Sequence, residues 1–218
     1  VEEDTSPTLG GNLDVSTHTI ITSTGNRDIN LVPNGTGTVQ ASAKIINYVG
    51  KQTMWVPATA MYATTTNGAE ANQAELTATN PELKTFMFDT TTAEYVQFNV
   101  AFPKNWDLST VTFQTMWSGS GTDTGTGGFK LSGVSIADNV DYDTAYGTAV
   151  ANTAVAASAT QDDLMINAES GAVTIASPAV DTNTSFQLVR NVAVDTNTGD
   201  LRLVGCKIFY TTNAANDD

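Results

Sequence analysis

The stretch EYVQFNVAF, residues 94–102, decides the fold class of this chain. Apolar side chains recur there at every second position, at Val96, Phe98, Val100 and Phe102. The positions between them include Tyr95, Gln97 and Asn99. Because successive side chains of a β-strand point to opposite faces, this period of two predicts a strand with one buried face and one solvated face.

The same alternation recurs from about residue 53 onward. In STVTFQTMW, residues 109–117, one face carries Val111, Phe113 and Trp117. Further strand candidates are KTFMFD, GFKLSGVSI, DLMINA, GAVTIA, SFQLVRNV and LRLVGCKIFYT. About eight strands with one wet face each are typical of antiparallel sheets packed as a sandwich. We therefore expect an all-β fold in which residues 51–218 form an antiparallel, jelly-roll-like β-sandwich head.

Four local patterns add to this prediction. Gly133 interrupts GFKLSGVSI, which predicts a β-bulge. The Ala-rich stretch 143–157 is where a short helix is expected. The repeat VDTNT occurs at 180–184 and 194–198, and its copies predict turns at the two ends of the strand SFQLVRNV. Cys206 alternates with apolar residues in LVGCKIFYT and is interpreted as a buried small hydrophobe.

Residues 1–50 form a second predicted region that is poor in large apolar side chains. Short strand-like pieces recur between turn signals such as Asn34-Gly35. Such a segment buries too little surface to fold alone. One interpretation is a disordered linker. The regular alternation favours another, a thin β-rich stalk whose three copies intertwine and share one core. Because the chain begins with Val1 rather than Met, we expect an N-terminal piece to be cleaved or to lie outside this numbering.

The charge is one-sided, with 9 Lys and Arg against 23 Asp and Glu, for a net charge of −14. Such a surface repels phosphate backbones and anionic membranes, so no nucleic-acid partner is expected. No apolar run approaches the ~20 residues that span a bilayer, so no membrane insertion is expected. With one cysteine there is no intrachain disulfide, and folding does not require an oxidising compartment.

Candidate metal ligands lie in DTNTGD, residues 195–200, which partly matches a calcium-binding loop. Its oxygen-bearing side chains Asp195, Asn197 and Asp200 are the candidates for a hard cation, against the default interpretation of a polar turn. His18 is the single histidine, so a Ser-His-Asp arrangement is not expected. No spacing of carboxylates marks a glycosidase pair. We expect no cofactor and no enzymatic activity.

Exposed aromatic residues are the remaining candidates for ligand contact, because Tyr and Trp stack on sugar rings and dominate recognition surfaces. Trp106 follows Pro103, where a strand ends, a position that can leave it partly exposed. Tyr142 and Tyr146 lie in an acidic loop. Packing in a core or in a subunit interface is the favoured interpretation for all three, and ligand contact is the alternative.

Several stretches carry a resemblance to a known group of proteins. WVPATAMYATTTNGAE at 55–70, EYVQFNVAFPKNWDLSTVTFQTMW at 94–117 and LRLVGCKIFYTTNAANDD at 201–218 resemble virion structural proteins of tailed bacteriophages. TSPTLGGNLDV at 5–15 and INLVPNGTGTV at 29–39 resemble the stalk segments of marine phage fibres. The resemblance implies a trimeric β-structured fibre or decoration protein and supplies no catalytic residues.

Together these observations lead to three functional hypotheses. The first is a non-enzymatic virion protein, made in the host cytoplasm, in which residues 1–50 attach a trimeric fibre to capsid or tail proteins and the head mediates host-surface attachment. The second is a capsid decoration or head-fibre protein that stabilises the shell. The third is a carbohydrate-binding receptor-recognition module, whose partner is a host-surface glycan.

Overall fold

Strands make up nearly all the regular structure in the computed structural model, which describes residue 36 and residues 50–214. The stalk predicted for residues 1–50 falls outside the described residues, apart from Thr36 and Gly50. Contacts divide the chain into two units, Val1–Lys44 and Ile45–Asp218, and the fold below belongs to the second. Over residues 36 and 50–214, no helix has the length and apolar character needed to cross a membrane.

The first sheet is built around β14 (Leu201–Thr212), the longest strand. Its order is β11 (Met165–Ile166), β6 (Thr112–Gly119), β14, β4 (Leu83–Phe88) and β3 (Glu70–Ala74). The strand β1 (Gly50–Pro57) pairs with the C-terminal part of β14, while β4 pairs with its N-terminal part. All of these pairs are antiparallel.

The second sheet has the order β12 (Ile175–Ala176), β8 (Phe129–Ile136), β13 (Asn183–Arg190), β5 (Tyr95–Val100) and β2 (Tyr62–Ala63). β9 (Val150–Ala151) also pairs with β8. These pairs are antiparallel except for β12 with β8. A short ribbon joins β7 (Thr126–Gly127) to β10 (Val155–Ala156), and a single 3-10 turn, η1 (Ala58–Ala60), follows β1.

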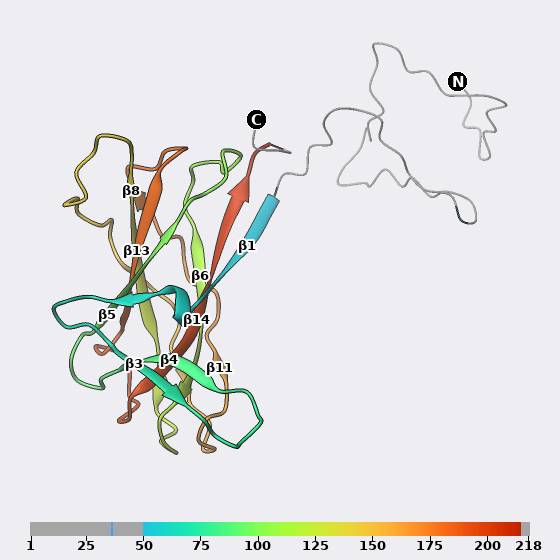
Figure 1. Cartoon of the computed structure of the whole chain (residues 1–218), viewed down its shortest axis with the longest axis vertical. Coiled ribbons are helices and arrows are strands. Elements are labelled where there is room, and N and C mark those ends of the chain that lie inside the picture. Colours follow the sequence, from blue (N-terminus) through green and yellow to red (C-terminus); the bar gives the residue numbers. More distant parts are fainter. Residues whose placement is uncertain (1–35, 37–49, 215–218) are drawn as a thin grey trace, which may run out of the picture. The chain divides into compact units, whose positions relative to one another are not determined.

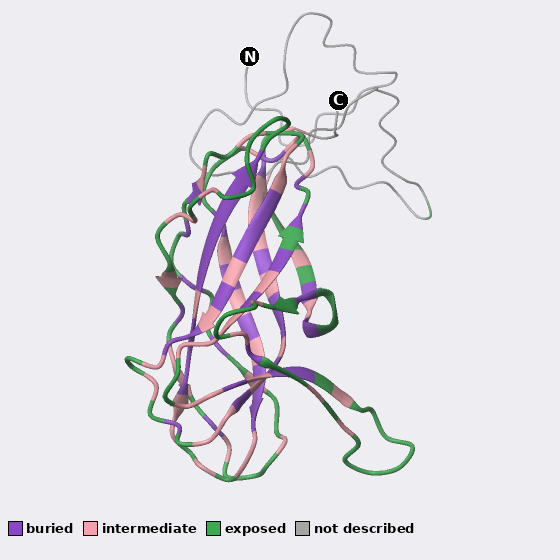
Figure 2. Ribbon diagram, turned by 60° about the vertical axis from the view of Figure 1, so that its left-hand side comes forward, coloured by how far each residue is buried: buried purple, intermediate pink, exposed green. Residues whose placement is uncertain are grey.

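The two sheets pack face to face as a jelly-roll-like sandwich, which confirms the predicted fold class. From β4 to β8 the long strands pass alternately from one sheet to the other (Figure 1), the crossing pattern of a jelly roll. Buried residues form a continuous core between the sheets (Figure 2). The strand EYVQFNVAF contributes to this core as its period predicts, through Val96, Phe98 and Val100.

The predicted helix near residues 143–157 is wrong. That stretch contains the short strands β9 and β10 instead. Alanine favours helices only weakly as a single-residue preference, and here strand pairing with β8 and β7 overrides it. The two VDTNT copies do flank one strand, since β13 begins at Asn183 and ends at Arg190.

The bulge predicted at Gly133 is also wrong, because the pairing of β8 with β13 continues through Gly133 without a shift. A Cβ atom at Gly133 would lie 2.8 Å from the ring of Phe186, so the glycine makes room for that ring. The register shift lies in β14 instead, between Leu203 and Gly205. It changes the phase of the strand, so that Leu203 and Cys206 both face the core. Cys206 is buried, as predicted.

Candidate functional site

The outer face of the second sheet carries aligned aromatic and amide side chains. In the register of the sheet Tyr62 lies opposite Gln97, and Gln97 lies opposite Gln187. The next row places Val189 between Tyr95 and Lys130. Because residues directly opposite have Cβ atoms about 5 Å apart, each row presents neighbouring side chains to one ligand.

The loop 137–149, between β8 and β9, covers part of this face. On the outer side of β8 the side chains of Ser132, Val134 and Ile136 are buried, with 5%, 1% and 5% exposure. The backbone N–H of Gly147 donates a hydrogen bond of 3.0 Å to the carbonyl of Gly133, which fixes the returning part of the loop on β8. The loop therefore forms a wall beside the open surface of β5 and β13.

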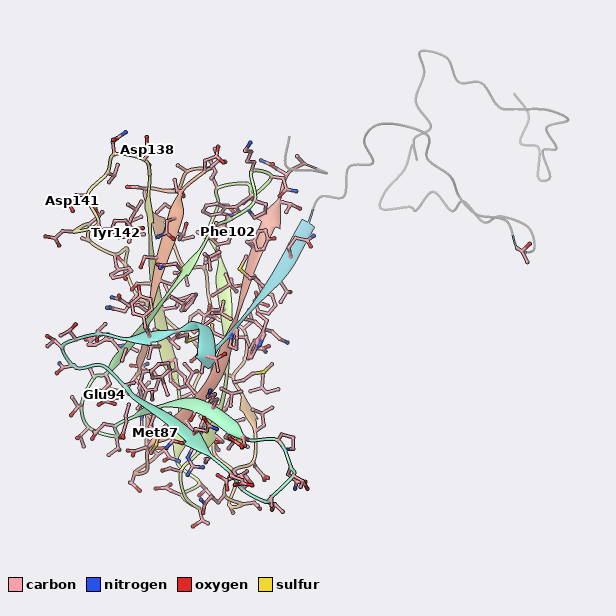
Figure 3. The ribbon with its side chains drawn as sticks, viewed as in Figure 1. Met87, Glu94, Phe102, Asp138, Asp141 and Tyr142 are labelled. Atoms are coloured by element: carbon pink, nitrogen blue, oxygen red, sulfur yellow. The ribbon has the colours of Figure 1, made fainter. Side chains whose placement is uncertain are left out.

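Two tyrosines of this loop are held by side chains of β13. The amide of Asn183 donates to the hydroxyl of Tyr142 at 2.6 Å. The hydroxyl groups of Tyr146 and Ser185 are 2.9 Å apart. Tyr142 remains 67% exposed, so its hydroxyl is anchored while most of the residue is open to solvent. Figure 3 shows Tyr142 on this loop together with Asp138 and Asp141, at the edge of the sandwich.

The loop and the sheet enclose two hollows that share Tyr146. The first, of about 240 Å³, is called the acidic hollow; it is lined by Tyr62, Gln97, Val134, Ile136, Tyr142, Asp143, Thr144, Tyr146 and Ser185. The second, of about 390 Å³, is called the valine hollow; it is lined by Ala93, Tyr95, Lys130, Ser132, Tyr146, Gly147, Ala149, Gln187, Val189, Arg190, Val192 and Ala193. Because the two hollows share Tyr146 they adjoin each other, and together they are called the tyrosine groove.

Several polar groups in the tyrosine groove have no hydrogen-bond partner among the described residues. These are the side-chain amides of Gln97 and Gln187 and the ammonium group of Lys130, all partly exposed. Burial raises the pKa of the Tyr146 hydroxyl, the contact with Ser185 lowers it, and the nearby Tyr62 raises it. The phenol is therefore protonated at neutral pH. The groove thus offers donors and acceptors beside exposed aromatic rings, with little charge.

The sequence placed Tyr142 and Tyr146 correctly in one loop, and the structure brings both to the tyrosine groove. For Trp106 the structure confirms packing in the core, and the partial exposure considered for it as a ligand-contact candidate is not observed. Its ring is 1% exposed and stacks on Phe102 with centroids 4.3 Å apart, so it belongs to the core. The chain turns inward there, since the N–H of Trp106 donates to the carbonyl of Pro103 at 3.0 Å.

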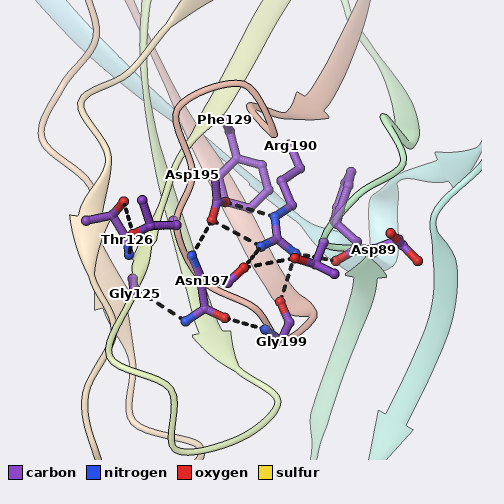
Figure 4. A network of polar contacts seen from close by, with 12 residues as sticks. Asp89, Gly125, Thr126, Phe129, Arg190, Asp195, Asn197 and Gly199 are labelled. Atoms are coloured by element: carbon purple, nitrogen blue, oxygen red, sulfur yellow. Dashed lines mark hydrogen bonds and ion pairs between the residues drawn. The ribbon is translucent and has the colours of Figure 1, made fainter.

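Two of the calcium-loop candidates, Asp195 and Asn197, lie beside the buried Arg190 (Figure 4). Arg190 donates to both carboxylate oxygens of Asp195, at 2.8 and 3.1 Å, and the two side chains are 0% and 1% exposed. Its remaining N–H groups donate to the carbonyls of Phe88, Gly199 and Asn197. The carboxylate of Asp195 is therefore used by an ion pair.

The side chain of Asn197 is used to hold the backbone. It accepts from the N–H of Gly199 at 2.9 Å and donates to the carbonyl of Asp123 at 3.0 Å. Asp200 contributes its backbone carbonyl, which accepts from the N–H of Ser120. Within residues 36 and 50–214, no group of three or more His, Cys, Asp or Glu side chains is arranged to hold a metal ion. The contacts of Arg190 and Asn197 hold the loop that follows β13 in place.

Two further hollows lie on the side of the first sheet. One, of about 350 Å³, separates η1 from the β3–β4 hairpin; its single aromatic side chain, Phe86, belongs to the core. The other, of about 240 Å³, is crossed by the ion pair of Lys51 and Glu169. Neither combines exposed tyrosine rings with free amides, so the tyrosine groove is the stronger candidate.

Sequence reasoning missed several members of this site. Tyr95 and Gln97 stand on the wet face of EYVQFNVAF, and that alternation was the signal that could have found them. Tyr62 lies in a strand of two residues, which is too short for a periodic pattern. Gln187 and Lys130 join the site only through the pairing of β13 with β5 and β8, which alternation within one strand does not reveal.

Comparison with known proteins gives only distant structural likeness. No protein-family model and no curated protein matches the chain. Among solved structures, a family 35 carbohydrate-binding module from Clostridium thermocellum is 9% identical with a TM-score of 0.41, covering 72% of this chain and 97% of that one. A family 35 module from Cellvibrio japonicus is 8% identical with a TM-score of 0.40, covering 75% and 99%.

A family 11 carbohydrate-binding module from Clostridium thermocellum, solved with a β-1,3-1,4-mixed-linked tetrasaccharide, is 9% identical with a TM-score of 0.34. It covers 76% of this chain and 98% of that one. At such values the likeness carries no inference about a ligand of this chain, which has to be argued from its own side chains.

Proposed function

We propose that the described β-sandwich is a non-enzymatic binding module that recognises a glycan in the tyrosine groove. The observation that carries this proposal is the combination of exposed tyrosine rings with unpaired amides in one concave surface. Aromatic faces pack on the C–H faces of sugar rings, and amides exchange hydrogen bonds with sugar hydroxyls. A site built in this way binds a polar ligand that also has flat apolar faces.

The lining of the groove also favours binding over hydrolysis. Among the described residues that line the two hollows, Asp143 is the one that carries a carboxylate. Glycoside hydrolysis ordinarily needs two carboxyl groups about 5 to 9 Å apart. A lining with one carboxylate supports recognition of a glycan rather than its hydrolysis.

Glycan binding is tested on an array of neutral and anionic oligosaccharides with the full chain and with Tyr62→Ala. Tyr62 is 46% exposed and stands at the edge of the acidic hollow. Loss of a stacking platform should weaken binding about tenfold or more. Trp55→Ala is the matched control, because Trp55 is 43% exposed but lies on the first sheet. Absence of signal across the array, or equal losses in both variants, would contradict the proposal.

Attachment of this module to a phage particle stays a prediction that rests on the resemblance of the sequence. The same holds for the trimer and for the alternative role in capsid decoration. The native mass of the full chain in solution is the direct measurement: a trimer has three times the chain mass of 22.9 kDa. Particles lacking the protein should then lose adsorption if it is a host-attachment fibre, or thermal stability of the shell if it is a decoration protein.

A further inference from the structure

The two hollows of the tyrosine groove differ in chemistry. The acidic hollow is lined mostly by hydroxyl, amide and carboxylate groups and by the rings of Tyr62 and Tyr142, with the two buried aliphatic residues Val134 and Ile136 behind them. The valine hollow is lined by five small aliphatic side chains: Ala93, Ala149, Val189, Val192 and Ala193. A sugar that carries only hydroxyl groups offers that aliphatic surface the C–H face of its ring but no methyl group. The ligand should therefore carry a small apolar substituent on one sugar unit.

Resting on the proposed glycan recognition, we propose that the valine hollow binds the acetamido group of an N-acetylated hexosamine, and that the acidic hollow takes the adjoining hydroxyl-rich sugar. An acetamido group has a methyl group, a carbonyl acceptor and an N–H donor. Val189 offers the methyl group an apolar contact. In the sheet register Lys130 lies directly opposite Val189, and its free ammonium can donate to the carbonyl. Gln187 precedes Val189 by two residues and lies on the same face, and its amide oxygen can accept the N–H of the acetamido group.

The junction of the hollows fits two linked sugar units. Gln97 lines the acidic hollow and Gln187 lines the valine hollow, and the two are directly opposite each other on β5 and β13. Tyr146 lines both hollows. Adjacent units of one glycan can therefore occupy both hollows. The neighbouring amides of Gln97 and Gln187 then lie beneath the glycosidic link.

Charge favours a neutral sugar over a carboxylated one. Arg190 lines the valine hollow, but its guanidinium is paired with Asp195 and is 0% exposed. Lys130 is the free cation of the described lining, and Asp143 stands in the neighbouring hollow. The whole chain has a net charge of −14, which disfavours approach of an anionic polymer.

The experiment compares sugar pairs that differ only at carbon 2. Isothermal titration of the full chain with the β-1,4-linked tetramers of N-acetylglucosamine and of glucose gives one pair, and N-acetylgalactosamine against galactose gives another. In at least one pair the N-acetylated member should bind about tenfold tighter, because it adds a buried methyl group and a hydrogen bond. Val189→Thr keeps the shape and adds a hydroxyl group, so it should reduce that preference several-fold, measured as the ratio of the two dissociation constants. Val194→Thr is the control, since Val194 is 57% exposed and does not line the hollow.

The outcomes separate this inference from the proposed function. Equal or tighter binding of the plain sugars would overturn the acetamido assignment and leave glycan recognition standing. Binding restricted to uronic or sialic acid glycans, and lost in Lys130→Met, would overturn it too, since Lys130 would then hold a carboxylate. A preference that Val189→Thr and Val194→Thr reduce equally would place the acetamido group elsewhere. No binding of any glycan would overturn both proposals.

Discussion

Replacing Asp195 by Asn should destabilise the sandwich strongly, because it leaves a buried arginine without its counter-charge. The side chains of Arg190 and Asp195 are 0% and 1% exposed and share two hydrogen bonds. An asparagine can keep one oxygen toward Arg190, but its NH₂ group then faces a second donor. Removing one partner of a buried ion pair costs about 3–5 kcal/mol. Residues 50–214 make a domain of about 165 residues with an unfolding entropy of about 0.35 kcal/mol/K. The expected decrease in Tm is therefore about 9–14 °C, measured by calorimetry.

The matched control is Asp181→Asn, which removes the same charge at an exposed position. Asp181 has a φ of 54°, a conformation that asparagine tolerates well, so the Tm of this variant should differ from that of the unchanged protein by less than about 2 °C. Equal changes in both variants would refute the buried ion pair. A double variant, Arg190→Met with Asp195→Leu, should recover only part of the loss. Although it removes both charges, it leaves the backbone carbonyls that Arg190 serves without a donor.

The remaining predictions concern packing, metal, thiol and pH. Gly133→Ala should lower the free energy of unfolding by about 1–3 kcal/mol, because the added Cβ would press on the ring of Phe186. Gly121→Ala is the control, since its methyl group enters open space, and denaturant titration compares the two variants. Calcium or a chelator should leave the Tm unchanged, and an increase with calcium would reopen the metal interpretation of residues 195–200. Burial raises the pKa of the Cys206 thiol, so a thiol reagent at pH 8 should react only after unfolding, and rapid reaction in the folded state would contradict this. The N–H of Thr91 donates to the carboxylate of Asp89 and lowers the pKa of that group. The ionised carboxylate therefore stabilises the fold above about pH 4, and this stabilisation is lost as the pH falls further. Asp89→Asn should flatten the acid side of a Tm–pH curve.

The fold was readable from sequence wherever one strand carried its own pattern. In EYVQFNVAF the alternation gave both the core side chains and the wet face, and β6 and β13 behaved alike. Prediction failed where partners decided the outcome. The phase of β14 changes at a bulge between Leu203 and Gly205, and the glycine of β8 accommodates the Phe186 ring of β13. Neither contact has a signature within a single segment, because pairing register and cross-strand packing are set by residues far apart in the chain.

The candidate site was readable only in part for the same reason. Tyr142 and Tyr146 could be picked out because aromatic residues in an acidic loop are unusual. Their partners Asn183 and Ser185 lie about 40 residues away in the chain and reach them through the fold of the loop over β13. The DTNTGD loop misled in the opposite direction. Its oxygen-rich pattern suits a cation, but a buried guanidinium supplies the positive charge instead.

One feature of β8 links the fold to the groove and was visible in its sequence. In FKLSGVSI the inner positions Phe129 and Leu131 face the core, yet Val134 and Ile136 on the opposite face are also apolar. A strand with apolar side chains on both faces has to be covered on both sides. Here the loop 137–149 provides the second cover. Its tyrosines reach Asn183 and Ser185 at the start of β13, so that β5 and the later part of β13 remain open beside the loop. Burial of the outer side chains of β8 thus positions the loop 137–149 beside the groove. Ile136→Ser should weaken the packing of this loop on β8 and reduce ligand binding before it affects the core.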